Sequence, residues 1–442
     1  MKIVKPLLQI LFITGVLFIL ALYFLKPQLK ILTGYVAKNV CSCVFLAERP
    51  LEQIRTQDVG YGLLKYAKVK VDRENQLVTS SVLGIIKQTA KYRGELGCYL
   101  ENKEAESYQL ESAIRFPAEN SQNAFPFGEG LPDTTLAISD SKLLEETLDE
   151  AFSYPSTSAV VVVKDNVLLA ERYKEGFDEN TIQLGWSMHK SITNALIGIL
   201  VQQGRLDIQK SAPIAVWQKD DRKQITINDL LQMSSGLEFV EEYAKRSDVT
   251  KMLFEESAMG KYAINKPLEA EVGSKHYYSS GTSNILSEIV RQQFDSNEAY
   301  WNFSYQSLFA KINAPSFRLE ADASGTFVGS SYAFATPRDW ARFGLLYLND
   351  GIWDGERILP EGWVEYTKTP AKHSEGDYGA HFWTNQGSKF PSAPKDMFWA
   401  RGFDGQYVFI LPSQNTVVVR LGVDGLGEMD ADALLKGIVA AL

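Results

Sequence analysis

Apolar and polar residues follow three different patterns along this chain. Residues 7–25 are uncharged and almost wholly apolar, and these 19 residues match the ~20 that a helix needs to cross a bilayer core. Between 192 and 200, apolar residues instead recur every three or four positions, which predicts a buried helix that ends at Gly204. Short apolar runs flanked by turn residues predict two β-hairpins, one over 159–172 and one over 407–421.

The two hairpins lie at opposite ends of the part of the chain that follows residue 150. Their predicted strands are 159–163 with 167–172, and 407–411 with 416–421. A helix that begins at Asp430 follows the second hairpin, and the stretch between the hairpins is mainly helical from about 205 to 350. Strands at both ends with helices between them predict a mixed α/β (α+β) fold, with one antiparallel sheet built from both ends and flanked by helices.

These patterns divide the chain into three sections. They are a transmembrane anchor at 1–26, a small extension of unknown role at 27–135, and a large domain at 136–442. Within the extension, short strands are predicted at 69–71 and 76–83, and a loop rich in Pro, Gly and Asn at 117–132. The extension is therefore predicted to be a small β-rich unit between the membrane and the large domain.

The residues that flank the apolar segment bear on how it would be oriented in a membrane and on whether it would be cleaved. Lys2 and Lys5 precede it, and Lys26 and Lys30 follow it, so the Lys/Arg bias does not fix an orientation. No small-x-small cleavage site follows closely, which favours an uncleaved anchor over a removed signal peptide. We expect a single span with a short cytoplasmic tail, and with the rest of the chain on the periplasmic or extracellular face.

All three cysteines fall in the extension. Export would permit one disulfide, joining Cys98 to Cys41 or to Cys43, with one thiol left over. The alternative is three inert thiols. No pair of histidines accompanies them at metal-ligand spacing, so neither a metal nor another cofactor is expected.

Overall charge and composition exclude one class of function. The net charge is −9 and the pI is about 5.2, which argues against binding nucleic acid through its phosphates. Hydrophobic residues make up 45% and charged residues 22%, values that are ordinary for a globular enzyme with a sizeable core.

The candidate chemistry begins with the spacing Ser-x-x-Lys, which occurs at 139–142, 187–190 and 392–395. The first copy resembles a helix cap, and the third contains Pro394 and precedes no apolar run. Only the middle copy opens a long apolar helix, whose start offers unpaired N–H groups and positive dipole potential. Ser187 and Lys190 therefore form a candidate nucleophile and base, the alternative being a capping serine with a solvated lysine.

Two later segments contain groups that could complete such a site. Tyr278 and Ser280 lie two residues apart in a loop, and a tyrosine beside an ammonium group can relay protons. Gly402 marks the start of the C-terminal hairpin, where the N–H of Phe403 could join that of Ser187 as an oxyanion donor. Taken alone, the first segment could be only a helix cap with a packed tyrosine, and the second only a glycine-marked strand.

The order of these three motifs resembles that of the serine β-lactamase-like and penicillin-binding hydrolases. Two flanking segments, 225–237 and 338–351, match as well. The chain is most similar to the class C-like branch, which includes esterases, D-aminopeptidases and 6-aminohexanoate-dimer hydrolases. The resemblance covers about 150–440 and leaves the anchor and the cysteine segment unexplained.

The resemblance implies an antiparallel sheet flanked by helices plus a helical subdomain, with the site between them. It implies that Ser187 is acylated, that Lys190 is its base partner, and that Tyr278 protonates the leaving group and helps to activate water. The chain departs from the family pattern at Ser280, where many members have Asn, and at Arg401, which replaces the lysine of Lys-Thr-Gly. The loss of that lysine disfavours β-lactam or peptidoglycan recognition unless Arg401 points inward.

Aromatic residues near the motifs predict a partly apolar cleft suited to a small-molecule ester or amide. They are Trp186, Tyr277, Trp399 and Phe403. A Ser-His-Asp triad is disfavoured because the chain lacks a Gly-x-Ser-x-Gly elbow. His189 turns away from Ser187, His276 is expected to be packed, and His373 and His381 are expected at the rim.

The sequence therefore predicts an exported, membrane-anchored serine hydrolase. The alternatives are a D,D-peptidase or β-lactamase, and a catalytically silent envelope protein that binds its ligand in the same cleft. Neither the substrate nor the oligomeric state follows from these patterns.

Overall fold

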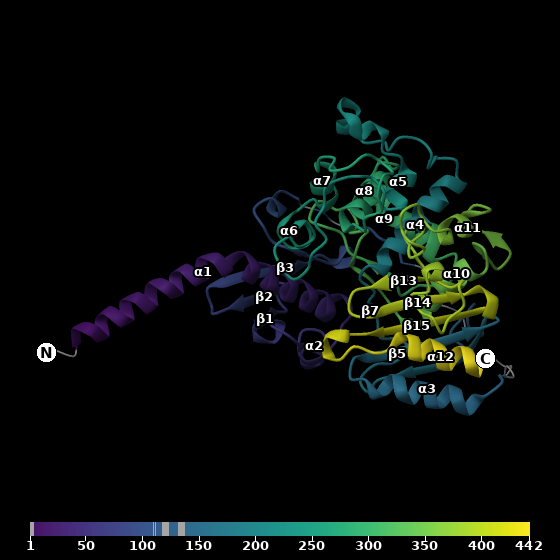
Figure 1. Cartoon of the computed structure of the whole chain (residues 1–442), viewed down its shortest axis with the longest axis horizontal. Helices are drawn as coiled ribbons and strands as arrows, with labels where there is room; N and C mark the ends of the chain where they lie inside the picture. Colours follow the sequence, from purple (N-terminus) through teal and green to yellow (C-terminus); the bar gives the residue numbers. More distant parts are fainter. Residues whose placement is uncertain (1–3, 109, 111, 117–122, 131–137) are drawn as a thin grey trace.

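The computed structural model describes residues 4–108, 110, 112–116, 123–130 and 138–442. One long helix, α1 (Val4–Cys41), projects from a body in which helices cover a central sheet (Figure 1). The loop predicted at 117–132 lies partly outside the described residues, as does the predicted boundary between 135 and 136.

The central sheet has six antiparallel strands in the order β12-β13-β14-β15-β5-β6. The strands are β5 (Thr157–Lys164), β6 (Val167–Tyr173), β12 (Trp383–Thr384), β13 (Phe398–Gly402), β14 (Gln406–Leu411) and β15 (Thr416–Gly422). The β5–β6 and β14–β15 pairs are the two predicted hairpins, and β15 pairs with β5. The prediction of one antiparallel sheet built from both ends is therefore confirmed.

Helices cover both faces of this sheet. Val160 and Val162 of β5 face α3 (Ser141–Ser153) and α12 (Ala431–Ala441), the helix that Asp430 caps. Val161 and Val163 point the other way, into the core shared with α4 (Met188–Gln202) and α10 (Pro337–Leu348). Because side chains alternate along a strand, one run of valines fills both layers.

The helical part of the body lies on the α4 side of the sheet (Figure 1). It comprises α5 (Ile227–Leu231), α6 (Asp248–Glu255), α7 (Met259–Ile264), α8 (Ser280–Arg291), α9 (Asn297–Ser304) and α11 (Trp363–Lys368). Thr226 caps α5 in a capping box with Asp229, as its sequence pattern predicts. Two small sheets complete this part. Their strands are β7 (Gln183–Leu184), β8 (Arg318–Leu319), β9 (Ala333–Ala335), β10 (Ile352–Trp353) and β11 (Glu356–Arg357). One sheet has three strands in the order β7-β9-β8, and the other pairs β10 with β11.

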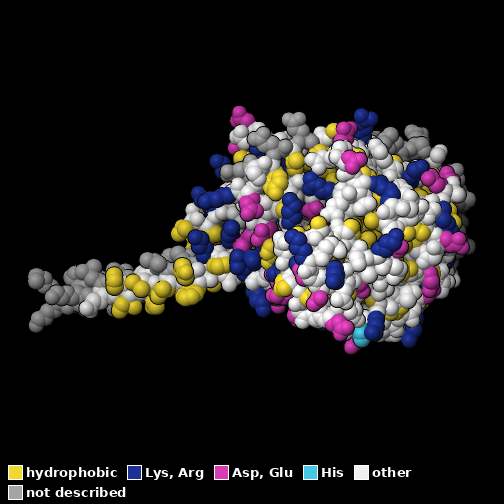
Figure 2. All heavy atoms as spheres, turned by 90° about the horizontal axis from the view of Figure 1, so that it is seen from above, with side chains coloured by type: hydrophobic (Ala, Val, Ile, Leu, Met, Phe, Trp, Pro, Cys, Tyr) yellow, Lys and Arg dark blue, Asp and Glu magenta, His cyan; other side chains and the backbone are white. Residues whose placement is uncertain are grey.

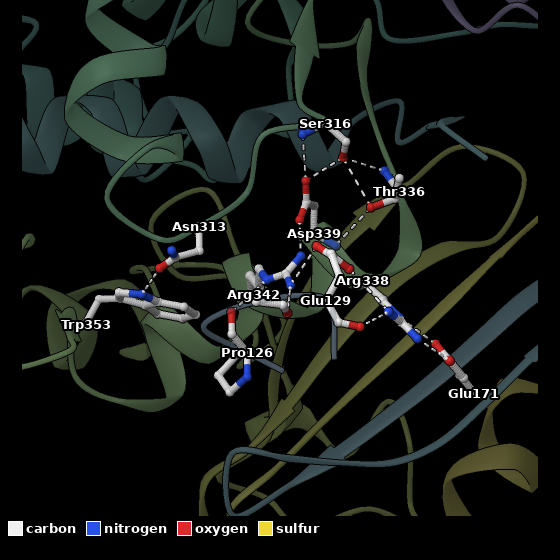
Figure 3. A network of polar contacts seen from close by, with 11 residues as sticks. Pro126, Glu129, Glu171, Asn313, Ser316, Thr336, Arg338, Asp339, Arg342 and Trp353 are labelled. Atoms are coloured by element: carbon white, nitrogen blue, oxygen red, sulfur yellow. Dashed lines mark hydrogen bonds and ion pairs between the residues drawn. The ribbon is translucent and has the colours of Figure 1, made fainter. Parts of the chain in front are cut away.

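A buried polar network fixes the start of α10, where Thr336 is the cap and Pro337 the first residue (Figure 3). Arg338 reaches Glu171 on β6, at 2.8 Å, and so joins the helix to the sheet. Arg342 forms an ion pair with Asp339 and donates to backbone carbonyls, including that of Pro126 at 2.9 Å. The arginines satisfy their donors inside the protein, as buried charges require.

The N-terminal part departs from the predicted boundary at residue 26. Helix α1 continues through Pro27 to Cys41 and packs on the sheet β1 (Lys68–Asp72), β2 (Leu77–Val82), β3 (Ile86–Tyr92) and β4 (Cys98–Leu100). The short helix α2 (Leu51–Gln57) lies between α1 and this sheet in the chain. The extension is β-rich as predicted, although β3 and β4 had no clear sequence signal. Of the two possible disulfides, the structure has Cys41–Cys98, and Cys43 is a buried free thiol.

Between Phe12 and Leu25, the described apolar side chains of α1 are mostly exposed, and Figure 2 shows hydrophobic side chains along the projecting segment. Among the described residues, one helical stretch, Tyr23–Leu46, is long and apolar enough to cross a membrane, but two thirds of it is buried inside the body. Several side chains of the predicted span at 7–25 lie outside the described residues. Length and composition alone are therefore weak support for a span.

A buried ion pair joins α1 to the large domain. Lys38 Nζ donates to the carboxylate of Glu320, and both side chains are almost fully buried. Ser42 Oγ donates to Glu320 Oε1 at 2.8 Å, and the Cys98 N–H donates to the same oxygen at 2.7 Å. The carboxylate is thus shared by three donors from the N-terminal part, which holds that part against the body.

Replacement of Glu320 by Gln should leave the Lys38 ammonium buried without a counter-charge. We expect the free energy of unfolding of the full chain to fall by about 3–5 kcal/mol, as measured by urea denaturation in detergent. The double variant Lys38→Met/Glu320→Gln should recover most of the loss. Glu356→Gln, which breaks the exposed Lys311–Glu356 pair, serves as the control and should cost less than ~1 kcal/mol. If Glu320→Gln and Glu356→Gln lowered the free energy of unfolding by the same amount, that result would contradict this account.

Candidate active site

Ser187 lies at the N-cap of α4, directly after a strained residue. Trp186 has φ of +48°, a left-handed conformation that costs a non-glycine residue about 1–3 kcal/mol. The preceding Gly185 is needed for space, because a Cβ there would overlap the ring of Trp340. The chain therefore makes a forced turn that presents the Ser187 hydroxyl at the start of the helix.

Aromatic side chains from distant parts of the chain hold Trp186 in this conformation. Its ring stacks on Tyr35 of α1, with centroids 5.7 Å apart, and meets Tyr332 at 5.8 Å. Phe403, just after β13, packs edge-on against it at 5.7 Å. These contacts give the strained residue the support that such backbone conformations require.

Lys190 is buried and directs its ammonium group at Ser187. Its Nζ lies 3.0 Å from Ser187 Oγ, 3.1 Å from Ser280 Oγ and 3.0 Å from the carbonyl oxygen of Ser330. Within the described part of the chain, no carboxylate lies within ion-pair distance of Lys190. The amine is therefore surrounded by neutral oxygens, and the nucleophile candidate is one of them. The prediction that the middle Ser-x-x-Lys copy brings these two side chains together agrees with this geometry.

Ser280 connects Lys190 to a carboxylate that sequence patterns did not reveal. It is the first residue of α8, and its hydroxyl donates to Glu241 Oε1 at 2.6 Å while its N–H donates to Glu241 Oε2 at 2.8 Å. Tyr243 donates its hydroxyl to Glu241 Oε1 at 2.8 Å. Loss of hydration at that hydroxyl, followed by the negative charge of Glu241, raises the pKa of Tyr243 well above its ordinary value, so it remains a donor.

Tyr278 reaches the same cluster through its ring. Lys190 Nζ lies over the ring face, 4.8 Å from the centroid, which is within cation–π range. The ring also packs against Trp383 at 5.4 Å and Tyr378 at 5.7 Å. Tyr278 is thus beside Lys190, but in this structure the contact is with the ring rather than with the hydroxyl oxygen.

The backbone around Gly402 approaches the turn that contains Ser187. A Cβ at position 402 would overlap the carbonyl oxygen of Gly185, so only glycine allows this contact. The N–H groups of Ser187 and Phe403 have no acceptor among the described residues. Both are therefore free to donate to a ligand, as an oxyanion site requires.

Three residues proposed from sequence are not brought to this site. The Arg401 guanidinium packs over the rings of Trp383 and Tyr407, and it lines a different cavity from the one beside Ser187. The physical reason is strand alternation, since the residue before Gly402 points to the opposite face. Trp399 is buried in the core below α12, and Tyr277 does not line the cavity; its hydroxyl oxygen accepts a hydrogen bond from the Glu241 N–H at 3.3 Å.

The histidines do not approach Ser187. His189 Nδ1 lies 2.7 Å from the Ser331 carbonyl oxygen, and His381 Nε2 lies 2.8 Å from Ser283 Oγ. His381 is buried, which corrects its expected place at the rim, whereas His373 is exposed. Burial lowers the pKa of both His189 and His381 to about 3, so both are neutral near pH 7. His276 packs on Tyr378, as expected.

The N-terminal part also holds the loop that follows Gly402. Tyr61 donates its hydroxyl to the Asp404 carboxylate and lies 3.4 Å from the hydroxyl of Tyr35. The Asp404 carboxylate accepts a further bond from the Gly425 N–H at 3.0 Å. Sequence reasoning missed Tyr35 and Tyr61 because no local pattern relates Tyr35 to Trp186, or Tyr61 to Asp404, 343 positions away.

A cavity of about 410 Å³ opens beside Ser187, and Trp186 and Phe403 form part of its wall. Among the described residues, no group of three His, Cys, Asp or Glu side chains is arranged to hold a metal ion. The arrangement can therefore supply a hydroxyl, an amine close to it, and backbone donors to a ligand in the cavity.

Comparison with known proteins agrees with this geometry. The beta-lactamase family model matches residues 144–438. A 6-aminohexanoate-dimer hydrolase of Paenarthrobacter ureafaciens is 23% identical over 310 residues, which cover 63% of this chain and 74% of that protein.

Two solved structures share the fold. A protein of Bacillus anthracis assigned as a 6-aminohexanoate-dimer hydrolase has a TM-score of 0.58 at 21% identity and covers 75% of this chain and 89% of its own. EstCE1, a hydrolase with promiscuous acyltransferase activity, has a TM-score of 0.56 at 12% identity, with coverages of 67% and 98%.

Replacement of Glu241 by Gln tests whether this carboxylate positions Ser280 for Lys190. Without the negative charge, the Ser280 hydroxyl loses its fixed acceptor and can turn away from the amine. We expect the rate at which a fluorophosphonate modifies the chain at Ser187 to fall by about tenfold. Intact-mass spectrometry over time measures this rate. The neighbouring Glu242→Gln is the matched control and should react like the wild type; equal rates for both variants would remove Glu241 from the site.

Proposed function

The chain belongs to the beta-lactamase family, and on that premise we propose that it hydrolyses an ester or amide bond through an acyl-enzyme on Ser187. Members of this family are serine hydrolases such as esterases and amidases. The observation that carries the proposal is the 3.0 Å contact between the buried Lys190 amine and the Ser187 hydroxyl. A 6-aminohexanoate-dimer hydrolase and a hydrolase with acyltransferase activity among the similar proteins support the same reaction class.

In the acylation step, Ser187 Oγ attacks the carbonyl carbon of the substrate. Its proton passes to the neutral form of the Lys190 amine, 3.0 Å away. The carbonyl oxygen becomes an oxyanion, which accepts hydrogen bonds from the N–H groups of Ser187 and Phe403. Each such donor is typically worth ~3 kcal/mol of the barrier. The proton then moves to the leaving alcohol or amine as the carbon–oxygen or carbon–nitrogen bond breaks.

In the deacylation step, water attacks the same carbonyl carbon. Lys190 accepts a proton from that water, and Ser187 Oγ takes the proton as the acyl–oxygen bond breaks, which releases a carboxylic acid. Tyr278 serves as the proton relay to the leaving group once its hydroxyl turns toward Ser187; its position beside the Lys190 ammonium supports this role. Ser280, held by Glu241, keeps the amine in line between these groups.

The position of Arg401 argues against the β-lactamase and D,D-peptidase alternatives. The third motif lacks the lysine that would hold a substrate carboxylate, and Arg401 lines another cavity. A silent binding protein would not need a buried amine at hydrogen-bond distance from the half-buried Ser187 hydroxyl, because burying a cation without a counter-charge is costly. A hydrolase of uncharged esters or amides fits the site better.

Substitution at the proposed nucleophile and base gives the direct test. Ser187→Ala and Lys190→Met should each lower kcat for p-nitrophenyl butyrate by at least about a thousandfold, because one removes the nucleophile and the other its base. Spectrophotometric release of p-nitrophenol measures the rate. Ser392→Ala, in the third Ser-x-x-Lys copy, is the matched control and should retain wild-type activity. Turnover of nitrocefin at rates comparable to the ester would favour a β-lactamase instead.

We further infer that α1 anchors the chain in a membrane, with the catalytic part outside the cytoplasm. The projecting segment exposes apolar side chains, among them Phe12, Leu17, Leu20 and Phe24 (Figure 2). The Cys41–Cys98 disulfide supports export, because disulfides persist in oxidising compartments. Lys65, Lys68 and Lys70 are exposed on the extension near the base of the helix, where they would suit an anionic membrane surface.

The anchor is tested by cell fractionation of the full chain. We expect the protein in the membrane pellet after a high-salt wash and in the supernatant only after detergent is added. Leu17→Arg/Leu20→Arg places two charges in the segment, at about 2.5–3.5 kcal/mol each, and should move most of the protein out of the membrane fraction. Leu83→Arg, at an exposed turn of the extension, should leave it in the pellet. A wild-type chain that remains in the salt-washed supernatant would refute the anchor.

A further inference from the structure

The cavity beside Ser187 has an apolar lining that the proposed reaction alone does not require. Its volume of about 410 Å³ lies within the range of small-molecule sites. Leu253 and Phe254 of α6, together with Phe403, form one side. Ser187 also lines the cavity, so a substrate whose carbonyl carbon lies at Ser187 Oγ would extend through mostly apolar surroundings.

The opposite wall is formed by the helix that projects from the body. Leu25, Leu29 and Leu32 of α1 are four and three residues apart, so they lie on one face of the helix, and all three line the cavity. Leu63, which is exposed, extends this wall from the segment after α2. The helix that we propose as the membrane anchor is therefore also a wall of the reaction chamber.

The apolar surface continues from the cavity onto the projecting segment. Leu25 is 51% exposed, and the preceding Phe24 is 71% exposed. Leu17 and Leu20, further toward the N-terminus, are exposed as well, and Figure 2 shows hydrophobic side chains along the projecting segment. An apolar chain could thus follow the exposed leucine and phenylalanine side chains of α1 to the cavity that Ser187 lines.

The chemistry of this lining restricts the substrate. Most of the lining is apolar, with polar members that include Gln28, Thr250 and Lys245. A charged or strongly polar chain would therefore lose hydration along most of its length and gain few partners, which is costly. An unbranched alkyl chain gains from burial along its whole length. The cavity opens directly onto the residue that carries the acyl group, so the acyl part of the substrate is the part that occupies it.

We propose that the protein hydrolyses amphiphilic esters or amides from the bilayer, and that the cavity between α1 and α6 holds their acyl chain. This inference rests on the proposed hydrolase function and adds the class of substrate. The acyl carbon bonds to Ser187 Oγ as the head group leaves with a proton, and water then releases the acyl chain as a carboxylic acid. The chain length that the cavity accepts sets the specificity.

The test uses the full chain in nanodiscs of phosphatidylethanolamine and phosphatidylglycerol. It compares p-nitrophenyl acetate with p-nitrophenyl octanoate. We expect kcat/KM to rise by about threefold per added methylene, and so by roughly several hundredfold over the six methylenes that separate the two esters. Leu29→Trp, which fills the cavity from α1, should lower the octanoate-to-acetate ratio of kcat/KM at least tenfold. Ala244→Phe is the second filling variant, at an exposed residue of the cavity wall outside α1. It should also lower the octanoate-to-acetate ratio of kcat/KM. Leu20→Trp, outside the cavity, is the matched control and should keep the wild-type ratio.

The outcomes separate this inference from the proposed function. The acyl-chain inference is overturned if kcat/KM stays constant or falls as the acyl chain of the ester lengthens. If turnover of the acetate still depends on Ser187, the hydrolase function stands. A ratio that neither filling variant changes also overturns the acyl-chain inference. If no ester is turned over and no fluorophosphonate labels Ser187, the hydrolase function fails. Binding of a fluorescent dodecanoate to Ser187→Ala, weakened at least tenfold when Leu29→Trp is added, would still support an acyl-chain site, and equal binding by both would overturn it.

Discussion

The burial of one ammonium group against neutral oxygens is the constraint on which the site depends. Lys190 has two serine hydroxyls and one carbonyl oxygen around its Nζ, and its nearest carboxylate, Glu241, is reached only through Ser280. Because the amine contacts the Ser187 hydroxyl directly, a proton can pass between the two without an intervening group. The strained turn at Trp186, the glycine at 402 and the start of α8 all serve to bring these groups together.

The N-terminal part belongs to this arrangement as much as the large domain does. Tyr35 supports Trp186 by stacking, and Tyr61 holds the loop after Gly402 through Asp404. The Lys38–Glu320 pair and the Cys41–Cys98 disulfide fix the helix that supplies these contacts. A segment that anchors the chain in a bilayer would therefore also shape the place where a substrate binds, which links the location of the protein to its specificity.

The parts that could be predicted from the sequence are those with local periodicity or a cap. The two hairpins, the helix after Ser187 and the helix capped by Thr336 have such signals. The predicted boundary at residue 26 does not coincide with the end of a helix, because α1 continues through Pro27 to Cys41, where tertiary packing outweighs the change in composition. Glu241 could not be found, since its link to Ser280 depends on how a loop folds back across 39 residues. Arg401 does not point toward Ser187, because alternate residues of β13 face opposite sides of the sheet. Predicting this would have required knowing the register of β13 to within one residue.

The most direct measurement is a crystal structure of the full chain after reaction with an octyl fluorophosphonate. The account predicts phosphorus bonded to Ser187 Oγ, the phosphoryl oxygen facing the N–H groups of Ser187 and Phe403, and the octyl chain between Leu29 and Leu32 of α1 and Phe254 of α6. An adduct on any other residue, or an octyl chain directed away from α1, would contradict it.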